Sequence, residues 1–212
     1  SRLGNPTVGA LEARLTALEE GAMCVALSSG TSAVMYSLIN IMSQGDNFVT
    51  ANQLYGGTYT MFDNILPEYG VDSKKVDITD LAAVENAIDD KTRAIYCETI
   101  TNPGLVVADI SALSEIAHSK GIPLIVDATF TTSAILKPFD YGADIVVYSL
   151  TKWMSGHGRV IAGAVIEKGG FDWGNGNFPL YDKPDTSYGG MRWGHDLGDL
   201  GNVAYSLSLI HI

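Results

Sequence analysis

Residues 144–158 read DIVVYSLTKWMSGHG, and the fold of the whole chain can be worked out from this stretch. An apolar run at 145–148 is followed by Ser149, Thr151 and Lys152, and then by a loop with two glycines. A lysine just beyond a strand usually points into solvent, because burying an ammonium group is costly. Taken alone, Lys152 is therefore expected at the surface, and any other role needs support from the remaining sequence.

Other short runs share this continuously apolar character. They are NFVTA at 47–51, RAIYCE at 93–98, PLIVDA at 123–128 and IAGAVI at 161–166. A strand that is buried on both faces of a sheet has this pattern, whereas a half-buried strand alternates apolar and polar residues. Each run, together with DIVVYS at 144–149, is therefore predicted to be a buried strand.

Helical patterns alternate with these runs. Apolar residues recur at spacings of three and four, and the predicted helices cover 8–18, 31–43, 81–88 and 110–117. Gly21 ends the first helix, and Asp109 is a candidate N-cap of the last. Helices that alternate with buried strands predict an α/β fold: a mostly parallel sheet covered by helices on both faces.

The composition excludes several classes of function. Charged residues make up 17% of the 212 residues and the net charge is -11, which argues against a nucleic-acid partner. Cys24 and Cys97 lie in apolar stretches and are predicted to be reduced core residues of a cytoplasmic protein. No Cys/His spacing suggests a metal site, and no apolar run reaches the roughly 20 residues of a membrane helix.

In a parallel sheet, ligands bind beyond the carboxyl ends of the strands. The segment LSSGTSAV at 27–34 is a candidate phosphate site of this kind, with Ser29, Gly30 and Thr31 at the start of a predicted helix. Glycine allows close approach of the backbone, and a helix N-terminus offers free N–H groups and a positive dipole end. The alternative is an ordinary Ser/Thr helix cap.

Three more polar or aromatic residues follow predicted strands. Asp127 ends a very apolar run, so its carboxylate needs a partner, either a ligand or a structural cap or ion pair. Tyr55, in LYGGT, stands beside two glycines, and a core tyrosine is the alternative. Asn102, in ETITNPG, by itself indicates only a turn.

One cofactor requires all of these groups together. Pyridoxal phosphate (PLP) needs a phosphate site, an acid for its ring nitrogen, a flat ring to stack on it and a lysine for its aldehyde. Ser149 and Thr151, two residues apart on an extended segment, can supply further phosphate donors. Bonded to PLP, Lys152 would not be a buried ammonium, so its position is accounted for.

The sequence resembles the Cys/Met-metabolism group of PLP-dependent enzymes, which have the fold type I large domain. The resemblance extends over nearly the whole chain and is carried by SRLGNPT, SSGTSA, LYGGT, ETITNP, VDATF and YSLTKW. It implies that Lys152 bonds to the cofactor's aldehyde and acts in catalysis, that Asp127 pairs with the ring nitrogen, and that Tyr55 stacks on the ring.

The resemblance also implies the remaining cofactor contacts. Asn102 would lie near the ring's phenolic oxygen, and Arg2 would reach the phosphate of a neighbouring subunit in a homodimer or homotetramer with shared active sites. The residues that complete the predicted cofactor-binding set are Ser29, Gly30, Thr31, Thr129, Ser149 and Thr151.

Within the family, the sulfhydrylase branch is favoured by Gly158 after His157, by the long insertion after Gly169 and by Gly57 in place of a reactive cysteine. It implies γ-replacement on O-acetyl-L-homoserine with sulfide or a small thiol, giving homocysteine or methionine plus acetate, in sulfur amino-acid biosynthesis. The alternatives are methionine or cystathionine γ-lyase, cystathionine γ-synthase, transamination, and a non-catalytic fragment that keeps the fold.

The resemblance divides the chain into three parts: 1–20, an N-terminal segment and first helix in a dimer contact; 21–168, the PLP-binding large domain; and 169–212, a long ordered loop and truncated connection to a C-terminal domain. The chain starts without methionine and stops abruptly, so we expect a fragment without the small C-terminal domain. That domain would carry the arginine for the substrate carboxylate. If the carboxylate is bound within this chain, Arg192 is the first candidate, and Arg159 departs from the family pattern.

Overall fold

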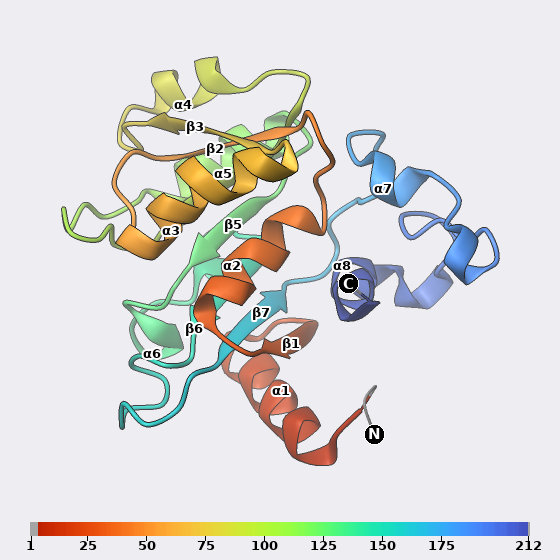
Figure 1. Cartoon of the computed structure of the whole chain (residues 1–212), viewed down its shortest axis with the longest axis horizontal. Coiled ribbons are helices and arrows are strands. Elements are labelled where there is room, and N and C mark those ends of the chain that lie inside the picture. The colour runs from red at the N-terminus through yellow and green to blue at the C-terminus, as the bar shows by residue number, and fades with distance from the viewer. Residues whose placement is uncertain (1–3, 212) are drawn as a thin grey trace.

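A computed structural model describes residues 4–211, with side chains to residue 210, and its centre is one seven-stranded sheet (Figure 1). The strand order is β1-β7-β6-β5-β4-β2-β3, and β7 alone runs in the direction opposite to the other six strands. This confirms the predicted α/β fold with a mostly parallel sheet. The strands are β1 (Met23–Leu27), β2 (Asn47–Ala51), β3 (Asp72–Val76), β4 (Thr92–Glu98), β5 (Leu124–Asp127), β6 (Ile145–Ser149) and β7 (Gly163–Glu167).

Helices pack on both faces of the sheet. In Figure 1, α2 and α3 lie in front of the strands and α5 lies behind them; α2 contacts β6 and β7, and α5 contacts β4 and β5. The longer helices are α1 (Pro6–Glu19), α2 (Gly30–Ile39), α4 (Leu81–Ala87), α5 (Ile110–Ser119) and α8 (Ala204–His211). The shorter ones are α3 (Gly56–Thr60), η1 (Met61–Ile65), η2 (Leu66–Tyr69), α6 (Thr132–Ile135), η3 (Pro138–Tyr141), α7 (Pro179–Asp182), η4 (Thr186–Tyr188) and η5 (Gly198–Val203).

All five predicted strands are present, but the sequence pattern missed β1 and β3, the two edges of the sheet. β3 reads DSKKV, and charged edge strands of this kind resist pairing with other chains. β1 is apolar but spans only five residues directly after a helix, so the pattern does not separate it from that helix. Both errors arise because the buried-strand pattern applies to the interior of a sheet.

The expectation of one long loop after Gly169 is wrong in its second half. Residues 179–211 contain α7, η4, η5 and α8, and α8 packs against β1 and β7. Aromatic side chains bury this segment against the sheet: Trp173 stacks on Tyr181 and Tyr205 with ring centroids 5.2 and 5.1 Å apart. Glu167, at the end of β7, accepts hydrogen bonds from Trp173 Nε1 (3.2 Å) and Ser206 N (2.8 Å).

The parallel strands end at one edge of the sheet and bring polar groups together there. β4 ends at Glu98, β5 at Asp127 and β6 at Ser149, and Glu98 lies opposite Asp127 in the register. The N-terminus of α2 points to the same edge. No helix within residues 4–211 is long and apolar enough to cross a membrane.

Candidate functional site

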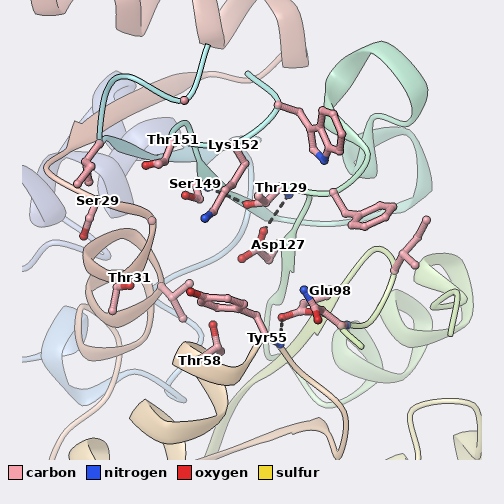
Figure 2. Close-up of a pocket in the computed structure, with 18 of the residues that line it drawn as sticks. Ser29, Thr31, Tyr55, Thr58, Glu98, Asp127, Thr129, Ser149, Thr151 and Lys152 are labelled. Carbon is pink, nitrogen blue, oxygen red and sulfur yellow. Dashed lines mark hydrogen bonds between the residues drawn. The ribbon is translucent and has the colours of Figure 1, made fainter. Parts of the chain in front are cut away.

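A cavity of about 680 Å³ opens at the carboxyl ends of these strands (Figure 2). Every predicted site residue except Arg2 lines it, and Arg2 lies outside the described residues. The cavity has the size and the mixed lining typical of small-molecule sites. Its lining residues are Ser29, Gly30, Thr31, Val34, Tyr55, Thr58, Glu98, Ile100, Asn102, Asp127, Thr129, Phe130, Ser149, Thr151, Lys152, Trp153, Gly156, Gly158 and Ile161.

The N-terminus of α2 forms one wall of the cavity. Ser29 is the N-cap, and its hydroxyl accepts a hydrogen bond from Ser32 N at 3.0 Å. Gly30 is required here, because a Cβ at this position would overlap the Cβ of Ser149. The helix start therefore lies directly against the end of β6, with its backbone N–H groups and positive dipole end at the cavity.

The end of β6 is held by two threonines. Ser149 N donates to Thr129 Oγ1 at 2.7 Å, which links the ends of β5 and β6 and leaves the Ser149 hydroxyl facing the cavity. Thr151 Oγ1 donates to Ala162 O at 3.2 Å and accepts from Ala162 N at 3.1 Å. The Thr151 hydroxyl thus bonds to the backbone of its own loop, so Ser149 is the better placed of the two to bind an anion.

Asp127 lies at the bottom of the cavity without a cationic partner among the described residues. Its carboxylate accepts hydrogen bonds from Thr129 N (2.9 Å) and Tyr96 OH (3.3 Å). Burial raises the pKa of Asp127, and these hydrogen bonds offset only part of the rise. A carboxylate in this state favours a ligand that brings a positive charge or a proton.

Lys152 is exposed, as expected for a lone lysine, but the surface to which it is exposed is the cavity. It lies in the turn after β6, with its N–H donating to Ser149 O at 3.2 Å. Figure 2 shows its side chain extending between Ser149 and Asp127, with the Tyr55 ring on the far side of the cavity. Among the described lining residues it is the only cation, so it is the available amine for a covalent bond.

Glu98 is a cavity residue that the sequence interpretation missed. Its carboxylate accepts hydrogen bonds from Tyr55 N (2.7 Å) and Asn102 N (3.1 Å), so it connects the loops after β2 and β4. Burial raises its pKa to about 7, with the charge of Asp127 adding to the effect. An acidic residue at the end of the apolar run RAIYCE was the available signal, since Asp127 was found by the same rule.

Arg192 does not line the cavity. Its guanidinium donates to Asp196 through Nε (3.1 Å) and Nη2 (2.9 Å), in the segment after α7. The suggestion that Arg192 binds a substrate carboxylate therefore has no support from its position. His157 hydrogen-bonds through Nδ1 to Ser155 O in its own turn.

The cavity residues fit PLP by their chemistry. The helix start and the Ser149 hydroxyl suit a phosphate, and the unpaired, part-buried Asp127 suits a protonated ring nitrogen. Lys152 supplies an amine on the same cavity, and Tyr55, with 48% of its surface exposed, has a ring free to stack. These features are independent of one another, so their convergence on one cavity is a specific signal.

Comparisons with known proteins agree with this interpretation. Residues 1–191 match the family model for "Cys/Met metabolism PLP-dependent enzyme". The chain is 44% identical over 193 residues to O-acetyl-L-homoserine sulfhydrylase from Leptospira meyeri, covering 91% of this chain and 44% of that protein. It is 44% identical over 214 residues to homocysteine synthase from Schizosaccharomyces pombe, covering 98% of this chain and 48% of that protein.

A solved structure shows the same fold. The crystal structure of a protein from Campylobacter jejuni, described as an O-acetylhomoserine (thiol)-lyase with N′-pyridoxyl-lysine-5′-monophosphate, matches with a TM-score of 0.88 and 34% identity. The match covers 99% of this chain and 57% of that chain. This chain thus spans about half the length of the relatives that it matches.

Proposed function

This chain belongs to the Cys/Met metabolism family of PLP-dependent enzymes, and we propose from that premise that it acts in γ-replacement on O-acetyl-L-homoserine. Sulfide or a small thiol would replace acetate at Cγ, giving homocysteine or methionine. The observation that carries the proposal is the 44% identity to the Leptospira sulfhydrylase and the Schizosaccharomyces homocysteine synthase. The cavity supports it independently, since its residues suit the cofactor that such a reaction needs.

PLP, when bound, would supply an aldehyde carbon for an amine and a protonated ring that accepts electrons. Lys152 would bond to the aldehyde carbon, and Asp127 would keep the ring nitrogen protonated. Tyr55 would stack on the ring, and Asn102 would lie near its phenolic oxygen. The phosphate would be held by the N-terminus of α2 (Ser29, Gly30 and Thr31) with Ser149 and Thr129 close by. Thr151 can join them only when its hydroxyl turns away from Ala162 O.

Lys152 would also carry the proton transfers. Once the substrate's amine has taken its place, the free amine of Lys152 would remove the proton from the substrate Cα, as a general base. In the net exchange, the bond from Cγ to the acetate oxygen would break, the sulfur of the incoming thiol would bond to Cγ, and the proton of the thiol would leave with acetate. Lys152 would return the proton to Cα.

The substrate carboxylate would be bound by a group beyond the described residues. No arginine lines the cavity within residues 4–211, and the described residues offer only Lys152 as a cation. A carboxylate is most specifically held by an arginine, through two parallel hydrogen bonds. We therefore expect these 212 residues alone to catalyse poorly.

Arg2 would complete the phosphate site of a neighbouring subunit, in a homodimer or homotetramer. Subunits carrying Arg2→Ala should then complement subunits carrying Lys152→Ala, because a mixed dimer has one site with both residues intact. The measurement is the activity of the mixture relative to each variant alone. No recovery after demonstrated subunit exchange would contradict a shared site.

The test of the reaction is a product assay with O-acetyl-L-homoserine on PLP-loaded protein in two forms: these 212 residues alone, expected to be poorly active, and a chain extended to the length of the relatives. Sulfide-dependent release of homocysteine and acetate is expected, and it should be lost in Lys152→Ala. Production of an α-keto acid and ammonia from methionine or cystathionine, with no sulfide-dependent product, would instead indicate a γ-lyase. Cystathionine formed from cysteine would indicate a cystathionine γ-synthase.

A further inference from the structure

We propose that Glu98 is a positioning residue, whose one carboxylate holds the loops that carry Tyr55 and Asn102 at the cavity. The consequence for catalysis rests on the proposed function, because it assigns Tyr55 and Asn102 to the cofactor ring. The structural part of the claim, that Glu98 orders both loops, can be tested without cofactor or substrate.

The geometry is that of a clamp with one oxygen for each loop. Glu98 Oε1 accepts from Tyr55 N at 2.7 Å, and Oε2 accepts from Asn102 N at 3.1 Å. The first bond is at the short end of the range for N–H donors, as expected when the acceptor is ionised. Glu98 is 6% exposed and ends β4 in the middle of the sheet, so it is a rigid point for both loops to be fixed to.

Tyr55 itself has few other contacts that orient it, although its neighbours Leu54 and Thr58 are buried. Tyr55 occupies the N-cap position of α3, a helix of five residues, and makes no side-chain capping hydrogen bond there. Tyr55 is 48% exposed, and its ring lies against Gly57, so packing restrains it on one side only. The bond from Tyr55 N to Glu98 therefore sets where α3 begins and where the Tyr55 ring stands over the cavity.

The charges around Glu98 make its protonation state sensitive to pH. Asp127 faces it from β5, Tyr96 and Cys97 precede it on β4, Tyr55 approaches from the loop after β2, and Lys152 lies across the cavity. Burial, with Asp127 adding to the effect, raises the pKa of Glu98 to about 7. The acid form is thus populated near neutral pH.

Protonation removes one half of the clamp. An ionised carboxylate accepts a hydrogen bond at each oxygen, whereas in the acid form one oxygen carries a proton and is a poor acceptor. Glutamine has the same shape and the same defect, because its amide nitrogen donates and does not accept. At every pH, Glu98→Gln should therefore behave as the wild type does at low pH.

The chain offers a matched control in Glu167. It is also a buried glutamate at the end of a strand, and it also accepts from two donors, Trp173 Nε1 and Ser206 N. These donors belong to the C-terminal segment, at the edge of the sheet opposite the cavity. Glu167→Gln thus makes the same chemical change without touching the Tyr55 or Asn102 loop.

The experiment is hydrogen–deuterium exchange by mass spectrometry on the full chain without PLP. Exchange at each pH is corrected for the intrinsic rate, in peptides that report the amides of Tyr55 and Asn102. In Glu98→Gln, at least one of the two amides should exchange about five- to tenfold faster than in wild type, the loss expected for one hydrogen bond. Glu167→Gln should leave both unchanged and should affect the amide of Ser206.

A pH series on the wild type gives a test that needs no variant. Protection of the same amide should fall as the pH decreases, with a midpoint near 7, and should not change with pH in Glu98→Gln. If the variant does not fold, the wild-type series decides alone. Unchanged protection in the folded Glu98→Gln, or no midpoint in the wild type between about pH 6 and 8, would overturn the proposal.

The catalytic consequence is measured separately, in the PLP-loaded protein. Glu98→Gln should keep the cofactor but lower kcat by about ten- to a hundredfold, with a smaller change in KM and an altered circular dichroism of the bound cofactor. If the proposed reaction is wrong, neither the wild type nor any variant will catalyse it. The effect of Glu98→Gln on amide exchange will still be observed. If the exchange result holds but kcat, KM and the dichroism equal those of wild type, Glu98 orders the loops without positioning catalysis.

Discussion

The two ends of the parallel strands differ in how their buried carboxylates are neutralised. At the amino ends, Asp46 pairs with Arg93 at 2.8 Å, and Asp144 pairs with His118 Nε2 at 2.8 Å. At the carboxyl ends, Glu98 and Asp127 accept hydrogen bonds only from uncharged donors. Neither of them forms an ion pair among the described residues. Burial raises the pKa of both.

This difference separates structural from functional acids on the parallel strands, whereas Glu167 on the antiparallel β7 is a structural acid that accepts hydrogen bonds only from uncharged donors. A buried carboxylate with a cation of its own is satisfied within the fold, whereas one without a cation makes the protein less stable unless a ligand supplies the charge. Perturbed carboxyls in a cleft are candidates for function for this reason. The amino ends therefore stabilise the sheet, and the carboxyl ends hold a site that is prepared for a cationic group.

Replacing Asp127 by asparagine should have the largest effect on activity and the opposite effect on stability. Turnover should fall by about a thousandfold or more, because asparagine cannot keep a ring nitrogen protonated. The folded-state pKa of Asp127 is raised, so its contribution to stability is present below the unfolded pKa and is lost as the pH rises through the folded value. At pH 8 without PLP, Asp127→Asn should therefore unfold at higher denaturant concentration than wild type.

Asp127→Glu is the control, and it should keep more activity than the asparagine variant because it keeps the charge. A loss of activity of only about two- to threefold in Asp127→Asn would contradict the assigned role. Lower stability of the PLP-free variant at pH 8 would contradict the claim that the carboxylate is unpaired.

At the other end of the sheet, Arg93→Met should have a large effect on stability and little on activity. It leaves Asp46 buried without its cation, and both side chains of this pair are at most 12% exposed. The free energy of unfolding should decrease by about 3 kcal/mol, measured by chemical denaturation. PLP binding and KM should be close to wild type.

Lys74→Met is the matched change at an exposed pair. Lys74 and Asp89 are 33% and 51% exposed, so their separation should cost less than about 1 kcal/mol. Equal losses of unfolding free energy in Arg93→Met and Lys74→Met would contradict the claim that burial makes the pair of Arg93 and Asp46 more important for stability.

The smallest effect is expected from His118, which titrates. Its hydrogen bond to Asp144 raises the pKa of His118. The stabilisation is therefore fully present below the unfolded pKa of about 6.5 and is lost as the pH rises through the higher folded value. Since His118 is 44% exposed, the change should be under about 1 kcal/mol. His118→Gln should remove this part of the pH dependence, and an unchanged slope would contradict the pairing.

Sequence alone predicted most of the interior of the sheet and most of the cavity. Asp127, Ser149 and Lys152 end or follow long apolar runs, and a polar group at such a position is visible without a structure. The convergence of these residues with Tyr55 and Gly30 follows from the parallel arrangement of the strands.

The missed features depend on contacts between distant residues. The role of Glu98 is evident only when Tyr55 N, 43 residues away, is seen to bond to it. The helices after residue 179 are short and form because their aromatic side chains pack on the sheet, which local sequence does not reveal. The hydrogen bonds between the Thr151 hydroxyl and the backbone of Ala162, eleven residues away, likewise depend on the conformation of the loop.

The unpaired acids and Lys152 are proposed to form a PLP site at the carboxyl ends of the strands. The most direct test is to load the full chain with PLP, reduce it with borohydride, and locate the attached pyridoxyl group by mass spectrometry of its peptides. We expect one modified residue, Lys152, with the label lost in Lys152→Ala and much reduced in Asp127→Asn. A label on another lysine, or stoichiometric PLP binding without a label on Lys152, would contradict it.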